Sequence, residues 1–310
     1  MDILTLSNVK KAFLEKQILK DISFSVTEHS IFGFIGQNGA GKTTTMKMIL
    51  GLMKIDEGEI KVCGKKVCFG QNETNQYIGY LPDVPQFYDF MTPKEYLLLC
   101  GSITGMTKKE AEKRADELLE MVGLADAKKR IKGFSRGMKQ RLGIAQALFN
   151  KPKLLICDEP TSALDPVGRK ELLDILVQAK KETTIIFSTH ILSDVERICD
   201  KVAFLHNGEI VLNGSLEQIK EKNIGTDFEI EFKIKEDMDK FVHKYNNIAC
   251  FDKKDLNGKN NTAFKVKYEK QSDEDILDKM NYMYSNRICP QKIERLEANL
   301  EDLFMEVVGR

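Results

Sequence analysis

In the first part of the chain, apolar residues recur at every second position or form short continuous runs, and both patterns predict β-strands. Strands are expected at Ile3–Ser7, Asp21–Val26, Ile31–Ile35 and Ile78–Leu81, with a hairpin of Glu59–Val62 and Val67–Phe69. From about Thr92 to Phe149 the apolar spacing becomes helical. Thr92 precedes a proline, and Thr107 has capping-box spacing to Glu110, so both threonines are expected to begin helices.

After this helical block, strand patterns return and alternate with helices. Strands are expected at Lys153–Cys157 and Thr183–Phe187 and in a hairpin of Val202–Leu205 and Glu209–Leu212, and helices at Gly137–Phe149, Val167–Lys180 and Ile191–Cys199. Strands that alternate with helices favour a mainly parallel α/β sheet. The helical block, at about 83–150, is therefore expected to be a subdomain inserted into this core.

A change of pattern near Asn223–Thr226 predicts a domain boundary. Beyond it, strands are expected at Phe228–Ile234 and Thr262–Tyr268, and helices at Glu236–Tyr245, Asp273–Tyr284 and the tail Glu297–Val308. The segment Ile288–Leu296 fits neither type. We expect one domain at 1–222 and a small C-terminal α+β domain at 223–310.

Composition narrows the classes of partner. The chain has 310 residues, with 47 Lys or Arg and 47 Asp or Glu, so its formal net charge is zero and no nucleic-acid partner is expected. No apolar run approaches the roughly 18 residues of a membrane span, and the first residues lack the apolar core of a signal peptide. The seven scattered cysteines favour reduced thiols.

The stretch Gly36–Thr43, GQNGAGKT, lies between an apolar strand and a helical pattern, as a P-loop does. Its glycines let backbone N–H groups point at a phosphate, and the helix N-terminus adds partial positive charge. Lys42 is expected to reach the β- and γ-phosphates, and the Thr43 hydroxyl to ligate Mg²⁺. The residues expected to bind the nucleotide here are Gly36, Gln37, Asn38, Gly39, Ala40, Gly41, Lys42, Thr43 and Thr44. The stretch predicts a P-loop NTPase that binds a nucleotide with Mg²⁺, and the further motifs indicate ATP.

Two adjacent carboxylates follow the apolar run Leu154–Cys157, in the Walker B pattern. Asp158 is expected to hold Mg²⁺ directly or through water, and Glu159 to act as the general base on the attacking water. A solvated turn is the alternative interpretation of the two acids. The P-loop upstream favours the catalytic one.

Further motifs resemble one family. Phe134–Gln140, FSRGMKQ, resembles the signature of ABC transporter ATPases, and Ser162–Asp165 resembles their D-loop. His190, after a strand, resembles their switch histidine, which contacts the γ-phosphate. Phe13 stands where the family has an aromatic residue that stacks on adenine, although an ordinary core or surface phenylalanine is a rival interpretation. Residues 1 to about 222 resemble such an ATPase domain throughout, which implies a RecA-like core with an antiparallel β subdomain and a helical subdomain.

The resemblance also implies an ATP-dependent, head-to-tail homodimer. Each ATP would lie between the P-loop of one subunit and Ser135, Gly137 and Asp165 of the other. Two departures from the family pattern affect these expectations. Arg136 replaces a signature glycine and either adds charge near the phosphates or faces solvent. Asp83 stands where a Mg²⁺-binding glutamine is usual, so the metal ligands implied are Thr43, Asp158 and Asp83, with Gln86 as the alternative to Asp83.

The function expected is therefore that of an ATP-hydrolysing subunit that powers a separate permease of an ABC transporter. The signature variant resembles exporters of the bacitracin type, which implies export of an antibiotic, peptide or hydrophobic compound, from a position in the cytoplasm at the inner face of the membrane. A soluble ABC-type ATPase that acts on nucleic acid or ribosomes is one alternative. A regulator with little turnover is another, against which Glu159 and His190 argue.

Overall fold

The computed structural model describes residues 1–14, 16–71, 73–222, 228–245, 250–255, 262–268, 272–295, 300 and 303–304, apart from the side chains of 220–222, 250–255 and 262–263. The chain divides into two compact units, Met1–Leu216 and Glu217–Arg310. The boundary expected from the sequence lies a few residues further along.

A six-stranded sheet with the order β10-β9-β3-β8-β7-β6 forms the centre of the first unit. Its strands are β3 (Ile31–Ile35), β6 (Ile78–Leu81), β7 (Leu154–Asp158), β8 (Thr184–Thr189), β9 (Lys201–His206) and β10 (Glu209–Ser215). All neighbours pair in parallel except β9 and β10. Every residue of β3, β7 and β8 is buried, as their continuous apolar runs require. The predicted parallel α/β core is confirmed.

A second, antiparallel sheet has the order β2-β1-β4-β5. Its strands are β1 (Asp2–Phe13), β2 (Lys16–Thr27), β4 (Glu57–Val62) and β5 (Lys65–Lys66). The prediction of Val67–Phe69 as the return strand of the hairpin was wrong. Cys63 and Gly64 both have positive φ and make a two-residue turn, so pairing resumes at once, with Lys65 opposite Val62.

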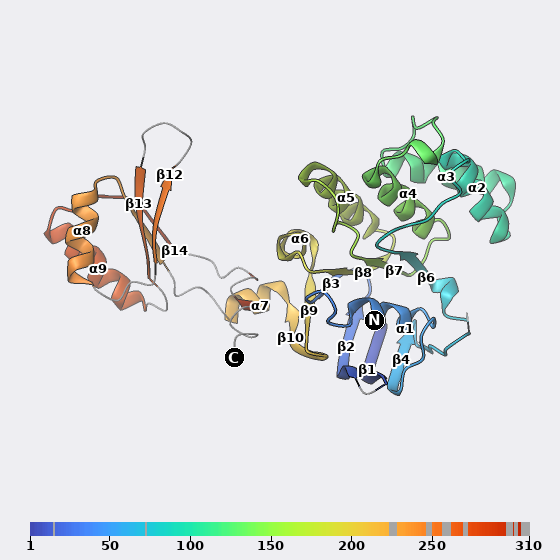
Figure 1. Ribbon diagram of the computed structural model, residues 1–310, viewed down its shortest axis with the longest axis horizontal. Coiled ribbons are helices and arrows are strands. Elements are labelled where there is room, and N and C mark those ends of the chain that lie inside the picture. The colour runs from blue at the N-terminus through green and yellow to red at the C-terminus, as the bar shows by residue number, and fades with distance from the viewer. Residues whose placement is uncertain are drawn as a thin grey trace. The chain divides into compact units, whose positions relative to one another are not determined.

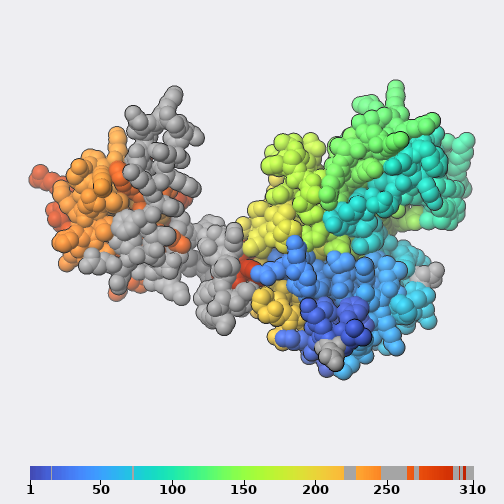
Figure 2. Space-filling model, viewed as in Figure 1, coloured from blue at the N-terminus to red at the C-terminus, as the bar shows by residue number. Residues whose placement is uncertain are grey.

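Figure 1 shows the helices of the first unit. Their bounds are α1 (Lys42–Ile49), α2 (Pro93–Ile103), α3 (Lys108–Met121), α4 (Arg136–Leu148), α5 (Pro166–Ala179) and α6 (Leu192–Ile198). Helix α1 packs into the apolar core shared by the two sheets. Helices α2 to α4 form the predicted helical subdomain, which is visible as a teal-to-green lobe (Figure 2). Thr92 and Thr107 begin α2 and α3 as expected. Thr107 closes the predicted capping box with Glu110, and Thr92 closes a further one with Glu95.

Glycines bring α4 close to the edge strand β6. A Cβ on Gly79 would overlap the carbonyl oxygen of Ala147, and a Cβ on Gly143 would overlap the Leu81 side chain. Both positions therefore need glycine for packing rather than for φ. This close approach holds the middle and the C-terminal end of α4 against β6 and against Pro85 in the loop that leaves it.

The second unit is a βαββαβ arrangement, the split βαβ of ferredoxin-like folds. Its strands, in the order β12-β13-β11-β14, and its helices are β11 (Phe228–Phe232), α8 (Lys235–Lys244), β12 (Cys250–Asp255), β13 (Thr262–Tyr268), α9 (Asp273–Ser285) and β14 (Pro290–Arg295), preceded by α7 (Leu216–Lys222). The sequence predicted the α+β class but missed α7 and β12. It left the type of Ile288–Leu296, which contains β14, undecided. Apart from Leu300, Leu303 and Phe304, which are helical, the predicted tail helix lies outside the described residues.

No helix in the described part of the chain is long and apolar enough to cross a membrane.

The Gly79→Ala substitution should destabilise the first unit by about 1–3 kcal/mol, because the added methyl group meets a backbone carbonyl that cannot rotate away. Urea unfolding of the full chain measures this loss. Gly133→Ala is the matched control, since its Cβ would meet nothing closer than Lys129 Cδ at 3.7 Å. Equal losses in the two variants would contradict the close approach.

Candidate functional site

The P-loop leaves β3 and enters α1 through a backbone that only glycine adopts easily. Gly41 has a φ of +112°, and a Cβ there would lie 2.8 Å from Leu19 Cδ2. A Cβ on Gly36 would lie 2.7 Å from the Leu205 carbonyl oxygen. The first unit can hold this tight turn because both positions lack a side chain.

The turn forms one wall of a cavity of about 350 Å³. The residues that line the cavity are Phe13, Ile18, Asn38, Gly39, Gly41, Lys42, Thr43, Thr44, Asp83 and Glu159. Most of the predicted nucleotide-binding residues are thus brought together. Gly36 and Gln37 contribute through their carbonyl groups, and the Ala40 N–H donates to Gln37 O at 3.1 Å.

Lys42 places a buried ammonium group at the cavity. Its Nζ donates to Gly36 O at 2.6 Å and to Gln37 O at 3.2 Å. Nζ also lies 3.0 Å from Glu159 Oε1, in an ion pair without hydrogen-bond geometry, so this buried oxygen has no hydrogen-bond partner. A buried cation and an unsatisfied buried acceptor fit a site that receives phosphate and a water molecule.

The two carboxylates at the end of β7 are held by β8. The buried Ser188 hydroxyl donates to Asp158 Oδ1 at 2.6 Å and accepts from the Glu159 N–H at 3.1 Å. Glu159 has a φ of +48°, a left-handed conformation that is unusual for a residue with a side chain. Such conformations cluster at functional sites, where the surrounding bonds maintain them.

His190, just beyond β8, approaches the same carboxylate. Its Nδ1 lies 2.9 Å from Glu159 Oε2, and the imidazole is partly open to solvent. The predicted pair of Glu159 and His190 is therefore in contact. Behind them, burial raises the pKa of Asp194, although the Thr161 hydroxyl donates to it at 2.7 Å. On the β6 side, burial next to Asp158 raises the pKa of Tyr80 to about 12.

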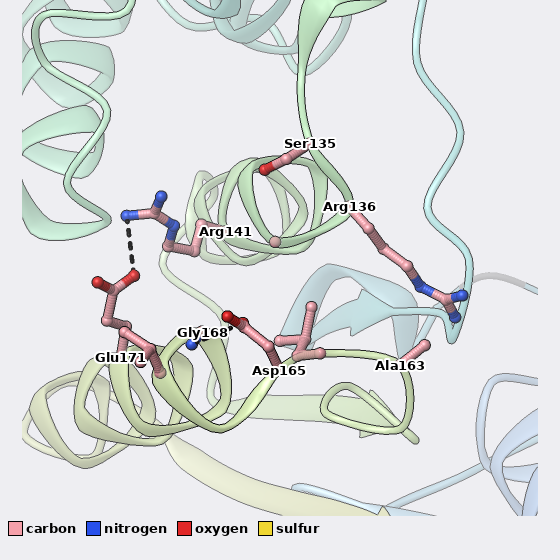
Figure 3. Close-up of a pocket in the computed structure, with 10 residues that line it drawn as sticks. Ser135, Arg136, Arg141, Ala163, Asp165, Gly168 and Glu171 are labelled. Atoms are coloured by element: carbon pink, nitrogen blue, oxygen red, sulfur yellow. Dashed lines mark hydrogen bonds and ion pairs between the residues drawn. The ribbon is translucent and has the colours of Figure 1, made fainter.

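The signature residues lie in a different cavity of about 420 Å³ (Figure 3). It is lined by Ser135, Arg136, Gly137, Arg141, Ala163, Leu164, Asp165, Val167, Gly168 and Glu171. Ser135 caps α4 by accepting from the Met138 N–H at 3.2 Å, and Asp165 caps α5 by accepting from the Gly168 N–H at 3.0 Å. Two helix N-termini therefore face this cavity, which favours an anion there.

Asp83 lines the first cavity but is already engaged. Its Oδ1 accepts from the Ser162 hydroxyl at 3.0 Å and lies 3.6 Å from a guanidinium nitrogen of Arg136. Its carbonyl oxygen accepts from Gln140 Nε2 at 2.5 Å. Gln86, the alternative to Asp83, is exposed and does not line this cavity.

The sequence alone assigned no role to Ser188 or Gln140. One feature could have indicated Ser188, since a polar residue at the end of a buried strand beside Walker B needs a hydrogen-bond partner. No sequence pattern indicates the long-range hydrogen bond from Gln140 to the Asp83 carbonyl oxygen.

The sequence profile of the ABC transporter family matches residues 19–162. The chain is 44% identical over 234 residues to the uncharacterised ABC transporter ATP-binding protein YxlF of Bacillus subtilis, covering 75% of this chain and 78% of the relative. It is 36% identical to the bacitracin transport ATP-binding protein BcrA of Bacillus licheniformis over 99% of this chain and 97% of the relative. The chain belongs to the ABC transporter ATP-binding proteins.

Solved structures of this family agree with the fold. An ATP-binding subunit of an ABC transporter superposes with a TM-score of 0.63 at 34% identity, covering 71% of this chain and 92% of that structure. A second, the ADP conformation of the cassette MJ1267, gives 0.65 at 27% identity, covering 72% and 94%. As a member of the ABC transporter ATP-binding proteins, the chain binds ATP and hydrolyses it to power transport.

Ser188→Ala should destabilise this ABC protein by about 1–3 kcal/mol, because the buried Asp158 carboxylate loses its hydroxyl donor. Chemical denaturation without nucleotide measures the loss. Ser102→Ala removes an exposed hydroxyl and should stay within about 0.5 kcal/mol of the parent. If Ser188→Ala leaves the free energy of unfolding unchanged, β8 does not hold Asp158.

Proposed function

We propose that this chain is the ATP-hydrolysing subunit of an exporter and works as a head-to-tail homodimer with a separate permease. The separation of the two cavities carries the proposal. The P-loop and Glu159 line one, whereas Ser135, Gly137 and Asp165 line the other. Each is half of a phosphate site, and a second copy in head-to-tail orientation supplies the missing half to both. This symmetry also closes the assembly, as a two-fold dimer requires.

Each group at the P-loop cavity has a role in the proposed ATP hydrolysis. Lys42 and the P-loop N–H groups bind the phosphates, while Phe13 offers an exposed ring on which adenine can stack. Glu159 accepts the proton of the attacking water at Oε1, the oxygen without a hydrogen bond. His190 orients that carboxylate through Oε2 and contacts the γ-phosphate. From the partner copy, the signature cavity presents the α4 N-terminus.

The donor set also fits Mg²⁺, which prefers oxygen ligands. The Thr43 hydroxyl is open to the cavity, and Asp158 provides a carboxylate. The described residues contain no group of three His, Cys, Asp or Glu side chains that could hold a metal by themselves, so phosphate and water oxygens would complete the shell. When bound, Mg²⁺ neutralises charge on the phosphates.

The permease has a suitable docking surface on the β6–α2 loop. Val84, Tyr88 and Phe90 all lie on this loop with more than half of their surface exposed. Clustered exposed apolar side chains indicate an interaction site. Docking there would hold the ATPase at the inner face of the membrane and place the permease next to Asp83.

The cargo proposed is an antibiotic, peptide or hydrophobic compound. Two relatives support this class, the bacitracin transport protein BcrA and the linearmycin resistance ATP-binding protein LnrL of Bacillus subtilis, which is 41% identical over 69% of each chain.

Glu159→Gln should lower ATP hydrolysis by roughly 10²–10⁴-fold, because the amide cannot accept the proton of the attacking water. ATP still binds, so the variant should accumulate as a dimer with Mg·ATP and remain monomeric without nucleotide. Phosphate release and light scattering measure the two effects. Glu120→Gln, on the exposed face of α3, is the control and should behave as the parent. A Glu159→Gln protein that stays monomeric at saturating Mg·ATP would refute the dimer.

The proposed association with a permease is tested by capturing tagged Glu159→Gln protein from its native membranes in mild detergent with Mg·ATP. Mass spectrometry should find a polytopic membrane protein in near-stoichiometric amount. Substituting Val84, Tyr88 and Phe90 by serine should abolish that recovery without lowering ATP binding. Ribosomal proteins or nucleic acid in place of a membrane protein would refute the transporter role.

A further inference from the structure

Asp83 and Arg136 join the two cavities of one chain. Asp83 lines the P-loop cavity and Arg136 lines the signature cavity, and their side chains form an ion pair at 3.6 Å. No other ion pair within the described residues joins these two linings. Both residues are departures from the family pattern, and the structure brings them together.

Additional bonds hold Asp83 in place. The Ser162 hydroxyl donates to the same oxygen that faces Arg136, and Gln140 on α4 donates to the Asp83 carbonyl group. Ser162 is the first residue of the D-loop stretch Ser162–Asp165, which follows Walker B. Asp83 is therefore bonded to the signature helix on one side and, through Ser162, to the Walker B segment on the other, since the Ser162 N–H donates to the Glu159 carbonyl oxygen at 3.2 Å.

Arg136 is the cation of the signature cavity that can change partner. Figure 3 shows Arg136 and Arg141 pointing to opposite sides of the cavity. Arg141 pairs with Glu171 at 3.7 Å, inside the same lining. Arg136 instead points away from Ser135 and Asp165, to a carboxylate that belongs to the other cavity. A phosphate in the signature cavity would compete with Asp83 for this guanidinium.

We propose that the Asp83–Arg136 pair is a shared latch that couples the two ATP sites of the dimer. This inference rests on the head-to-tail dimer proposed above. In that dimer, each ATP meets Asp83 of one chain and Arg136 of the other. The first ATP draws Arg136 of one chain to its phosphate, and Mg²⁺ bound with it would draw Asp83 of the other chain, so a latch opens in each chain. The second ATP then binds without opening either latch again.

The coupling is therefore positive, since the cost of opening the latch is carried by one binding event. Exposed ion pairs are individually weak, and two of them open together. The second ATP should therefore bind roughly 2- to 10-fold more tightly than the first.

The latch is tested by calorimetric titration of the full-length Glu159→Gln protein with Mg·ATP. This variant binds ATP with little hydrolysis, so the titration measures the Hill coefficient of binding. Asp83→Asn in this background should lower the Hill coefficient and tighten binding of the first ATP. Arg136→Gln should also lower the Hill coefficient, whereas Arg136→Lys keeps the charge and should retain part of the cooperativity. The double variant Asp83→Asn/Arg136→Gln should be no less cooperative than either single variant.

The pair Lys139–Asp89 provides the matched control. It joins α4 to the same loop at 3.4 Å with similar exposure, but neither residue lines the P-loop cavity or the signature cavity. Asp89→Asn should leave the Hill coefficient unchanged. Thermal unfolding without nucleotide gives a second measure, since the losses for Asp83→Asn and Arg136→Gln should be less than additive in the double variant.

The results separate the latch from the dimer. A dimer whose cooperativity survives Asp83→Asn, or falls equally with Asp89→Asn, overturns the latch and leaves the dimer standing. A dimer that binds ATP without cooperativity also overturns the latch. A parent protein that never dimerises with Mg·ATP refutes the proposed function, and the latch falls with it.

Discussion

The pairing of the buried Lys42 ammonium group is the interaction on which the rest of the site depends. A cation removed from water must be paired, and the chain offers two carbonyl oxygens and the Glu159 carboxylate. A polyphosphate would be a better partner for this ammonium group than the neutral carbonyls. The same pairing draws Glu159, just beyond β7, towards α1 and so brings Walker B and the P-loop together at one edge of the sheet.

The central sheet makes this assembly possible because the carboxyl ends of β3, β8 and β7 meet at one edge. The P-loop follows β3, His190 follows β8, and the two carboxylates close β7. Ligands of open α/β sheets bind outside these ends. The Ser188 bond then fixes the carboxylates across neighbouring strands, so the site is built on rigid elements with short loops.

The local parts of this arrangement could be predicted from the sequence, whereas the long-range parts could not. The P-loop, Walker B and the capping box at Thr107 depend on residues a few positions apart, and their patterns identify them. The β5 strand was misplaced because Lys65 and Lys66 carry no apolar signal, and only the turn at Cys63 and Gly64 sets where pairing resumes. β12 was missed for a similar reason, since CFDKKD is mostly charged.

Arg136 shows most clearly why the site could not be completed from the sequence. Extra charge near phosphate and exposure to solvent were equally good interpretations, because nothing nearby in the chain decides between them. The decisive contact crosses from α4 to the loop after β6, and it exists because Gly79 and Gly143 let these elements approach closely. A packing constraint far from the phosphates therefore determines which carboxylate Arg136 meets. Two departures that each weaken the resemblance to the family pattern become, as a pair, one connection between motifs that would act on different ATP molecules in the proposed dimer.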